Sequence, residues 1–136
     1  MNESLKIAFC EKQAELFVLA KEKGHDSESF IKPFMKSDTT KNLDKPFHHM
    51  QWAGAHYLLP RMEEDCADAL IQGESYDTET FYWAGYLYRY WHIYTSESSR
   101  EIYKQIPAKT MRIVYLMYHT MAIDRLKESY QEKHKK

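Results

Sequence analysis

One aromatic segment constrains the fold of this chain more than any other feature. Between Glu79 and Tyr94 the sequence reads ETFYWAGYLYRYWHIY, and no proline interrupts it. A helix formed by these residues would be apolar or amphipathic on every face, which is typical of a central, buried helix and not of a one-sided surface helix. We therefore expect a helix over residues 78–95, capped by Asp77 or Thr78, against which the other helices pack.

The rest of the chain also follows a helical pattern. Apolar residues recur at intervals of three and four, and no long stretch alternates with a period of two. With only four glycines and four prolines, the composition argues against a β fold with many turns. The sequence therefore predicts an all-α, single-domain bundle of six or seven helices. Besides residues 78–95, the expected segments are residues 3–23, a short helix capped by Ser27, a turn or short helix within residues 37–46, residues 46–71, a short helix capped by Ser96, residues 107–119 and residues 120–133.

Two prolines fall within or beside expected helices. Pro33 would have to lie outside the middle of the helix after Ser27, or bend it. Pro60 interrupts residues 46–71, and the sequence leaves open whether it kinks one helix or separates two. The part after it, residues 61–72, is expected to form an amphipathic surface helix. The acidic outer face of this helix would consist of Glu63, Glu64, Asp65 and Asp68.

Length and charge narrow the class of protein. A chain of 136 residues can bury a real core, so we expect a single domain over residues 1–136, with a frayed tail at residues 131–136. The net charge of −1 gives no overall basic field that would attract nucleic acid or anionic lipid. No apolar run is long enough to span a bilayer, and the first residues do not resemble a signal peptide. These features predict a cytoplasmic protein that does not enter a membrane.

Neither the cysteines nor the histidines form a pattern typical of a metal site. Cys10 and Cys66 lie far apart without a second cysteine nearby, so we expect buried, reduced thiols. His49 and His56 would lie two turns apart on one helix face, which is too far for two ligands of one metal without a partner between them. Together with His48 they are more typical of surface or capping histidines. We expect no metal and no cofactor.

Arg89 and His92 are the two polar residues set within the aromatic segment. They are three residues apart and would be neighbours on the surface of a helix. A buried guanidinium needs an anion or carbonyl groups as partners. One interpretation is structural, with Arg89 paired to a carboxylate inside the protein. The carboxylates considered for this pair are Asp77, Glu79 and Glu101.

The other interpretation of Arg89 is functional. Tyrosine combines a large apolar ring with a hydroxyl that forms hydrogen bonds, so Tyr86 and Tyr90 could meet Arg89 and His92 in a shared opening. We expect this opening to bind an acidic ligand or a partner. Stacking of nucleic-acid bases on these rings is disfavoured, because no lysines or arginines are interleaved with them apart from Arg89.

Arg112 and His119 form a second candidate pair. They are seven residues apart, which places them two turns apart on one helix face. An arginine can hold a phosphate and a histidine can move a proton. The spacing resembles that of the HEPN ribonucleases, an all-α family of about this size with an arginine and a following histidine near the C-terminal end. The resemblance implies RNA as substrate and metal-independent cleavage, with Arg112 as phosphate binder and His119 as general acid–base.

Three motifs carry a second resemblance. The stretches YWAGYLYRYW (82–91), ESSREIY (97–103) and YHT (118–120) are similar to a group of small, uncharacterised, all-helical bacterial proteins, many from Gram-positive anaerobes. Members of this group are encoded in mobile-element or toxin–antitoxin-like loci. The resemblance implies a cytosolic protein that works with the product of a neighbouring gene. It does not distinguish the toxin from the antitoxin.

The sequence therefore predicts a small protein–protein interaction module, such as the antitoxin or regulator of a toxin–antitoxin-like system. The acidic helix face, the many tyrosines and the lack of a convincing catalytic set favour this function over an enzyme. The alternative is a ribonuclease toxin that uses Arg112 and His119. A third hypothesis is a small-ligand binder with its pocket at Arg89. A homodimer is compatible with all three.

Overall fold

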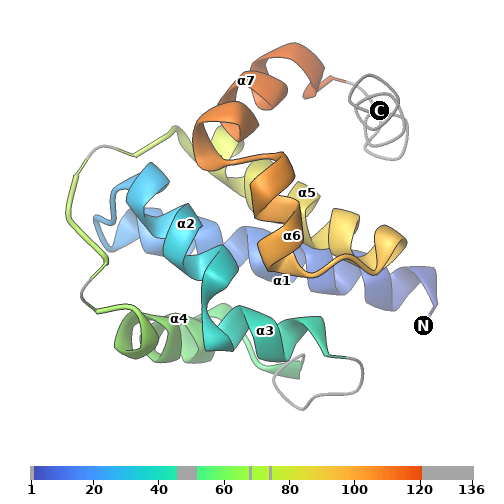
Figure 1. Ribbon diagram of the computed structural model, residues 1–136, viewed down its shortest axis with the longest axis horizontal. Coiled ribbons are helices and arrows are strands. Elements are labelled where there is room, and N and C mark those ends of the chain that lie inside the picture. The colour runs from blue at the N-terminus through green and yellow to red at the C-terminus, as the bar shows by residue number, and fades with distance from the viewer. Residues whose placement is uncertain (1, 46–51, 68, 74, 121–136) are drawn as a thin grey trace.

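The computed structural model describes residues 2–45, 52–67, 69–73 and 75–120. Within these ranges the chain forms an all-α bundle with seven α-helices, as predicted (Figure 1). The helices are α1 (Glu3–Glu22), α2 (Ser27–Lys36), α3 (Asp38–Asp44), α4 (Ala55–Asp65), α5 (Thr78–Thr95), α6 (Ser99–Gln105) and α7 (Ala108–Tyr118). In the described part of the chain, no helix is long and apolar enough to cross a membrane. The expected helix at 120–133 and the expected tail at 131–136 lie almost entirely outside the described residues.

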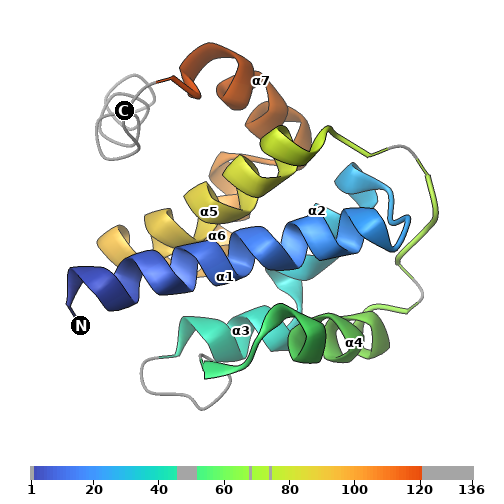
Figure 2. The same ribbon diagram turned by 180° about the vertical axis from the view of Figure 1, so that it is seen from behind.

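The antiparallel pair of α1 and α5 forms the centre of the bundle. It is the most extensive helix–helix contact in the described structure, and α7 lies on the opposite side of this pair from α3 and α4 (Figure 2). The two helices approach closely at Gly85, where a Cβ atom would lie 2.9 Å from the Cα of Ala14 and 2.9 Å from the carbonyl oxygen of Gln13. A glycine is needed there because both neighbouring atoms belong to the backbone of α1.

The core is richest in aromatic rings around Phe17 of α1. Its ring centroid lies 5.4 Å from that of Phe30, 5.2 Å from that of Phe34 and 5.1 Å from that of Phe81. All four side chains are fully buried. The three helices α1, α2 and α5 therefore meet in a dry cluster that contains no polar side chain among these four residues.

The prediction of a central aromatic helix is confirmed by α5. Asp77 is its N-cap and accepts a hydrogen bond from the Thr80 backbone N–H, and the helix ends at Thr95. Ser96 then adopts a left-handed conformation with φ of 62°. The helix is not buried on every face, however, since a stripe of half-buried tyrosines runs along one side. These tyrosines are Tyr82, Tyr86, Tyr90 and Tyr94.

The predicted helix over residues 46–71 is wrong in extent. Of its described residues, only Ala55–Asp65 belong to the α-helix α4, with Pro60 inside it. The predicted surface helix at 61–72 stops early because the chain turns back and pairs with the segment between α1 and α2. The Asp26 N–H donates to the Ile71 carbonyl oxygen, and the Gly73 N–H donates to that of Gly24. A tertiary contact thus overrides the local helical pattern.

Two predicted helix caps are also corrected. Asp26 caps α2 in place of Ser27, whose hydroxyl oxygen accepts a hydrogen bond from the Tyr76 N–H. Ser98 caps α6 in place of Ser96, which instead ends α5. Both shifts follow from competition between neighbouring polar residues for the same role. The alternative of a short helix within residues 37–46 is realised as α3, and Pro33 lies within α2.

Candidate functional site

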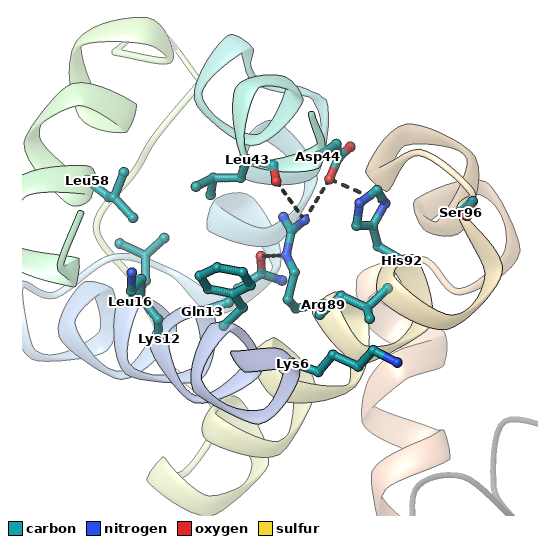
Figure 3. A pocket seen from close by; sticks show the side chains of 12 residues that line it. Lys6, Lys12, Gln13, Leu16, Leu43, Asp44, Leu58, Arg89, His92 and Ser96 are labelled. Carbon is teal, nitrogen blue, oxygen red and sulfur yellow. Dashed lines mark hydrogen bonds and ion pairs between the residues drawn. The ribbon is translucent and has the colours of Figure 1, made fainter. Parts of the chain in front are cut away.

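Arg89 of α5 is almost fully buried, with 4% of its surface exposed. Its Nε donates to the Oε1 of Gln13 on α1 at 2.9 Å, and its Nη1 donates to the Oδ1 of Asp44 on α3 at 2.9 Å (Figure 3). The same Nη1 lies 3.4 Å from the carbonyl oxygen of Leu43. An internal carboxylate therefore partners the arginine, as the structural interpretation expected. The residue is Asp44, however, and none of Asp77, Glu79 and Glu101.

Asp44 and Gln13 extend this pair into a network that joins four helices. The Asp44 carboxylate also accepts from the backbone N–H of Ser99 at 2.8 Å and from its hydroxyl at 2.7 Å, at the start of α6. The Nε2 of Gln13 donates to the carbonyl oxygen of Gly85 at 3.1 Å. Each polar group thus has a partner on another helix, which specifies how α1, α3, α5 and α6 are arranged.

One nitrogen of Arg89 is left out of this network. Its Nη2 is buried and has no hydrogen-bond partner among the described residues. A buried donor without an acceptor destabilises a protein by about 1–3 kcal/mol. Sites with such a donor invite an explanation, because native structures contain few of them.

His92 lies one turn after Arg89 on α5. Its Nδ1 is 2.7 Å from the carbonyl oxygen of Glu97 and 3.7 Å from the Oδ1 of Asp44. Burial, followed by the positive charge of Arg89, lowers the pKa of the imidazole, although Asp44 acts in the opposite direction. In the neutral form Nδ1–H donates to Glu97 and Nε2 is an acceptor. The ring therefore adds polarity to the site without adding a charge at neutral pH.

A pocket of about 390 Å³ opens beside Arg89. In Figure 3, Leu16, Leu43 and Leu58 gather on one side of the guanidinium, while His92 and Ser96 lie on the other. The charged groups that line the pocket are three cations and one carboxylate, so its lining is positive overall. The lining residues are Lys6, Phe9, Lys12, Gln13, Leu16, Leu43, Asp44, Leu58, Arg89, His92, Ile93 and Ser96.

The structure divides the four residues expected to share one opening. Arg89 and His92 line the pocket just described, but Tyr86 and Tyr90 do not. These two tyrosines line a separate groove between α1 and α5, together with residues that include Tyr82, Tyr94 and Cys10. The reason is helical geometry, because Tyr86 and Tyr90 are separated from Arg89 by angles that point them to another side of α5.

Sequence reasoning missed Gln13, Asp44 and Lys12. A signal for Gln13 was present, since it falls on α1 within the apolar set Cys10, Ala14 and Phe17, where a polar residue needs a buried partner. Asp44 gave no local signal, because it lies 45 residues before Arg89 in the chain. Only the three-dimensional arrangement of α3 and α5 brings the two together.

Arg112 and His119, the alternative catalytic pair, both lie at the exposed surface of α7 and its C-cap. The Arg112 guanidinium lies 5.3 Å from the ring centroid of Tyr76. The His119 ring stacks on Tyr115 with centroids 4.4 Å apart, and its Nδ1 is 2.8 Å from the Tyr115 carbonyl oxygen. Two helical turns separate the pair by about 10 Å along the axis. Their catalytic role stays a prediction.

The outer face of α7 presents three neighbouring apolar side chains to solvent. Ile113, Leu116 and Met117 are 57%, 65% and 63% exposed. They fall on one side of the helix, because their positions differ by three and four residues. The opposite side of α7 is anchored in the core through Met111 and Val114.

Cys10 and Cys66 are both free thiols. Burial raises the pKa of Cys10 to about 12 and also raises that of Cys66, so neither is a reactive thiolate at neutral pH. His56 is exposed, whereas His48 and His49 lie outside the described residues. Among the residues that are described, no group of three or more histidine, cysteine, aspartate or glutamate side chains could hold a metal ion.

We compared the chain with models of protein families, with curated proteins and with solved structures, and none of these three comparisons found a match.

Proposed function

We propose that the protein is an interaction module that binds another protein through the outer face of α7. The observation that carries this proposal is the apolar set Ile113, Leu116 and Met117, each more than half exposed. Exposed apolar residues that form one contiguous patch are typical of interaction sites, whereas scattered ones are ordinary.

The spacing of these residues suits one mode of recognition. Helices that lie in a hydrophobic groove of a partner use anchors at positions i, i+3 and i+4, which are Ile113, Leu116 and Met117 here. The inner face of α7 is held by Met111 and Val114 in the core. The anchors are therefore presented by a helix that is already folded, and this reduces the entropy lost on binding.

Charge indicates what kind of partner fits. Lys109 and Arg112 are exposed at the first half of α7, and the helix contains no carboxylate. Packing α7 against α7 of a second copy would bring only cations together, which is unfavourable. The partner we propose is therefore a different protein, with an apolar groove whose rim carries aspartate or glutamate.

The resemblance to proteins of toxin–antitoxin-like loci supports a more specific proposal. The partner would be the product of a neighbouring gene, and the chain would act in the cytoplasm as its antitoxin or regulator. Binding of a neutralising module commonly requires a preformed anchor face of this kind, because association must compete with the activity of the toxin.

Co-expression with the neighbouring gene product tests the proposal. We expect the two proteins to co-purify, and we expect Leu116→Asp with Met117→Asp to abolish the complex while changing the free energy of unfolding by no more than about 0.5 kcal/mol for each substitution. Ile71→Asp is the matched control, since Ile71 is 56% exposed but lies away from α7. A complex that survives the α7 substitutions would rule out this docking face.

The alternative function is that of a ribonuclease toxin. Its supporting observation is that Arg112 and His119 are both exposed along the same helix, where an RNA strand could reach them. Expression alone would then arrest growth, and His119→Ala would restore it, while His56→Ala at another exposed histidine would not. Harmless expression that protects cells from the neighbouring gene product would instead support the antitoxin.

A further inference from the structure

We propose that the pocket beside Arg89 binds a small amphipathic carboxylate, with the carboxylate at the guanidinium and an apolar chain along the leucine side. This binding site is separate from the α7 face, so either proposal can fail without the other. Four steps lead to the chemistry of the ligand.

The first step is the free donor. Arg89 has 4% of its surface exposed, and it lines the pocket while its Nη2 has no partner among the described residues. Nε and Nη1 are already held by Gln13 and Asp44, so the guanidinium cannot rotate to satisfy Nη2 without breaking those bonds. An oxygen acceptor placed in the pocket would satisfy this donor.

The second step is the charge of the acceptor. Asp44 neutralises one cation of the lining, and Lys6 is occupied by an ion pair with Glu3 at 3.4 Å. Lys12 adds a further positive charge on the same lining, and burial lowers the pKa of its ammonium group. A negative charge bound between Arg89 and Lys12 would relieve the burial of both, so an anion is favoured over a neutral acceptor.

The third step is the apolar part. Five lining residues are aliphatic or aromatic, and three of them gather on one side of the guanidinium (Figure 3). They are Phe9, Leu16, Leu43, Leu58 and Ile93. A pocket of about 390 Å³ is within the range that holds small organic ligands. A bare inorganic anion would leave this apolar surface uncovered.

The fourth step separates a carboxylate from a phosphate. Phosphate sites gather several donors, as in nests of backbone N–H groups or clusters of arginines. This pocket offers one arginine nitrogen and a nearby lysine, and its remaining lining is largely apolar or already hydrogen-bonded. Such a donor set suits the single negative charge of a carboxylate.

Titration of the isotope-labelled protein with octanoate tests the inference. We expect backbone amide signals of Leu43, Asp44, Arg89 and His92 to shift, and the melting temperature to rise with octanoate concentration. Octanamide, which has the same chain but no charge, should bind at least about tenfold more weakly. Octyl phosphate and inorganic phosphate serve as further probes of the head group.

Substitutions locate the carboxylate. Lys12→Met keeps the aliphatic part of a half-buried side chain and should weaken octanoate binding about two- to fivefold. Lys23→Met, at the exposed C-terminal end of α1, is the matched control and should change nothing. Arg89→Gln should abolish octanoate binding if it folds, and Lys12→Met decides the question if it does not.

Three results would overturn the proposal. Equal binding of octanamide and octanoate would remove the role of the charge, and tighter binding of octyl phosphate would exclude a carboxylate as the preferred head group. An absence of shifts at Arg89 and Asp44 at saturating octanoate would show that the pocket is not a binding site at all.

Discussion

The two ends of the contact between α1 and α5 are built from opposite chemistry. At one end Phe17 packs against Phe30, Phe34 and Phe81 with no polar side chain among the four rings. At the other end, one turn earlier on α1, Gln13 forms a hydrogen bond with the buried Arg89. We call these the dry end and the polar end.

The difference between the two ends lies in what each can contribute. Burial of rings stabilises the fold but depends little on direction, so the dry end could tolerate other packings of similar volume. Hydrogen bonds depend on geometry, and breaking them leaves charges without partners. The polar end therefore contributes specificity of arrangement, and it keeps one donor, the Nη2 of Arg89, for a further acceptor.

Phe17→Ala should have the largest effect and would test whether stability resides at the dry end. Removing a fully buried phenylalanine from contact with three other rings should lower the free energy of unfolding by about 3–5 kcal/mol. Urea denaturation followed by circular dichroism measures this change. A loss below about 1 kcal/mol would show that the rings repack and that the dry end is not the main source of stability.

Arg89→Gln should lower the free energy of unfolding by about 3 kcal/mol, because it leaves the Asp44 carboxylate buried without its cation. The double variant with Asp44→Asn should lose less than the sum of the two single variants, since it removes both charges together. Additive losses in urea denaturation would contradict the direct pairing of Arg89 with Asp44.

Gly85→Ala tests the boundary between the two ends. The added Cβ would meet backbone atoms of Ala14 and Gln13, so we expect a loss of about 1–3 kcal/mol in the free energy of unfolding. The sign is decisive, because without this clash the same substitution inside a helix would stabilise by roughly 1 kcal/mol. Thermal denaturation of the variant distinguishes the two outcomes.

His92→Gln should have the smallest effect, and only in mildly acidic solution. Burial lowers the pKa of His92 in the folded protein below the ordinary value of about 6.5. As the pH falls below 6.5, the unfolded chain binds a proton that the folded protein binds less readily, so the wild type loses stability. The variant lacks this loss. Urea midpoints of both proteins at neutral and mildly acidic pH should therefore converge as the pH falls, and a constant difference would contradict the prediction.

Local patterns predicted the elements whose causes are local. The aromatic helix, its cap at Asp77 and its end at Thr95 follow from residues within or beside the helix itself. Helix α4 was predicted too long because its end depends on the pairing of Ile71 with Asp26, and no local pattern contains that contact.

The candidate site was predicted in kind but not in composition. A buried arginine paired with an internal carboxylate was anticipated, but Asp44 was not, because its position depends on how α3 packs against α5. The polar Gln13 on an apolar stripe was the one local sign of the network. Tyr86 and Tyr90 were grouped with Arg89 because they are close in sequence, although the helix directs them elsewhere.

The central position of α1 and α5 has a consequence for biosynthesis. Because α1 is made first and its main contact is with α5, its apolar face stays uncovered until α2, α3, α4 and then α5 have left the ribosome. Contacts between distant segments form more slowly than contacts within a hairpin of helices. We expect a ribosome-bound chain that ends before residue 78 to be recognised by chaperones, and one that extends well beyond residue 95 to escape them.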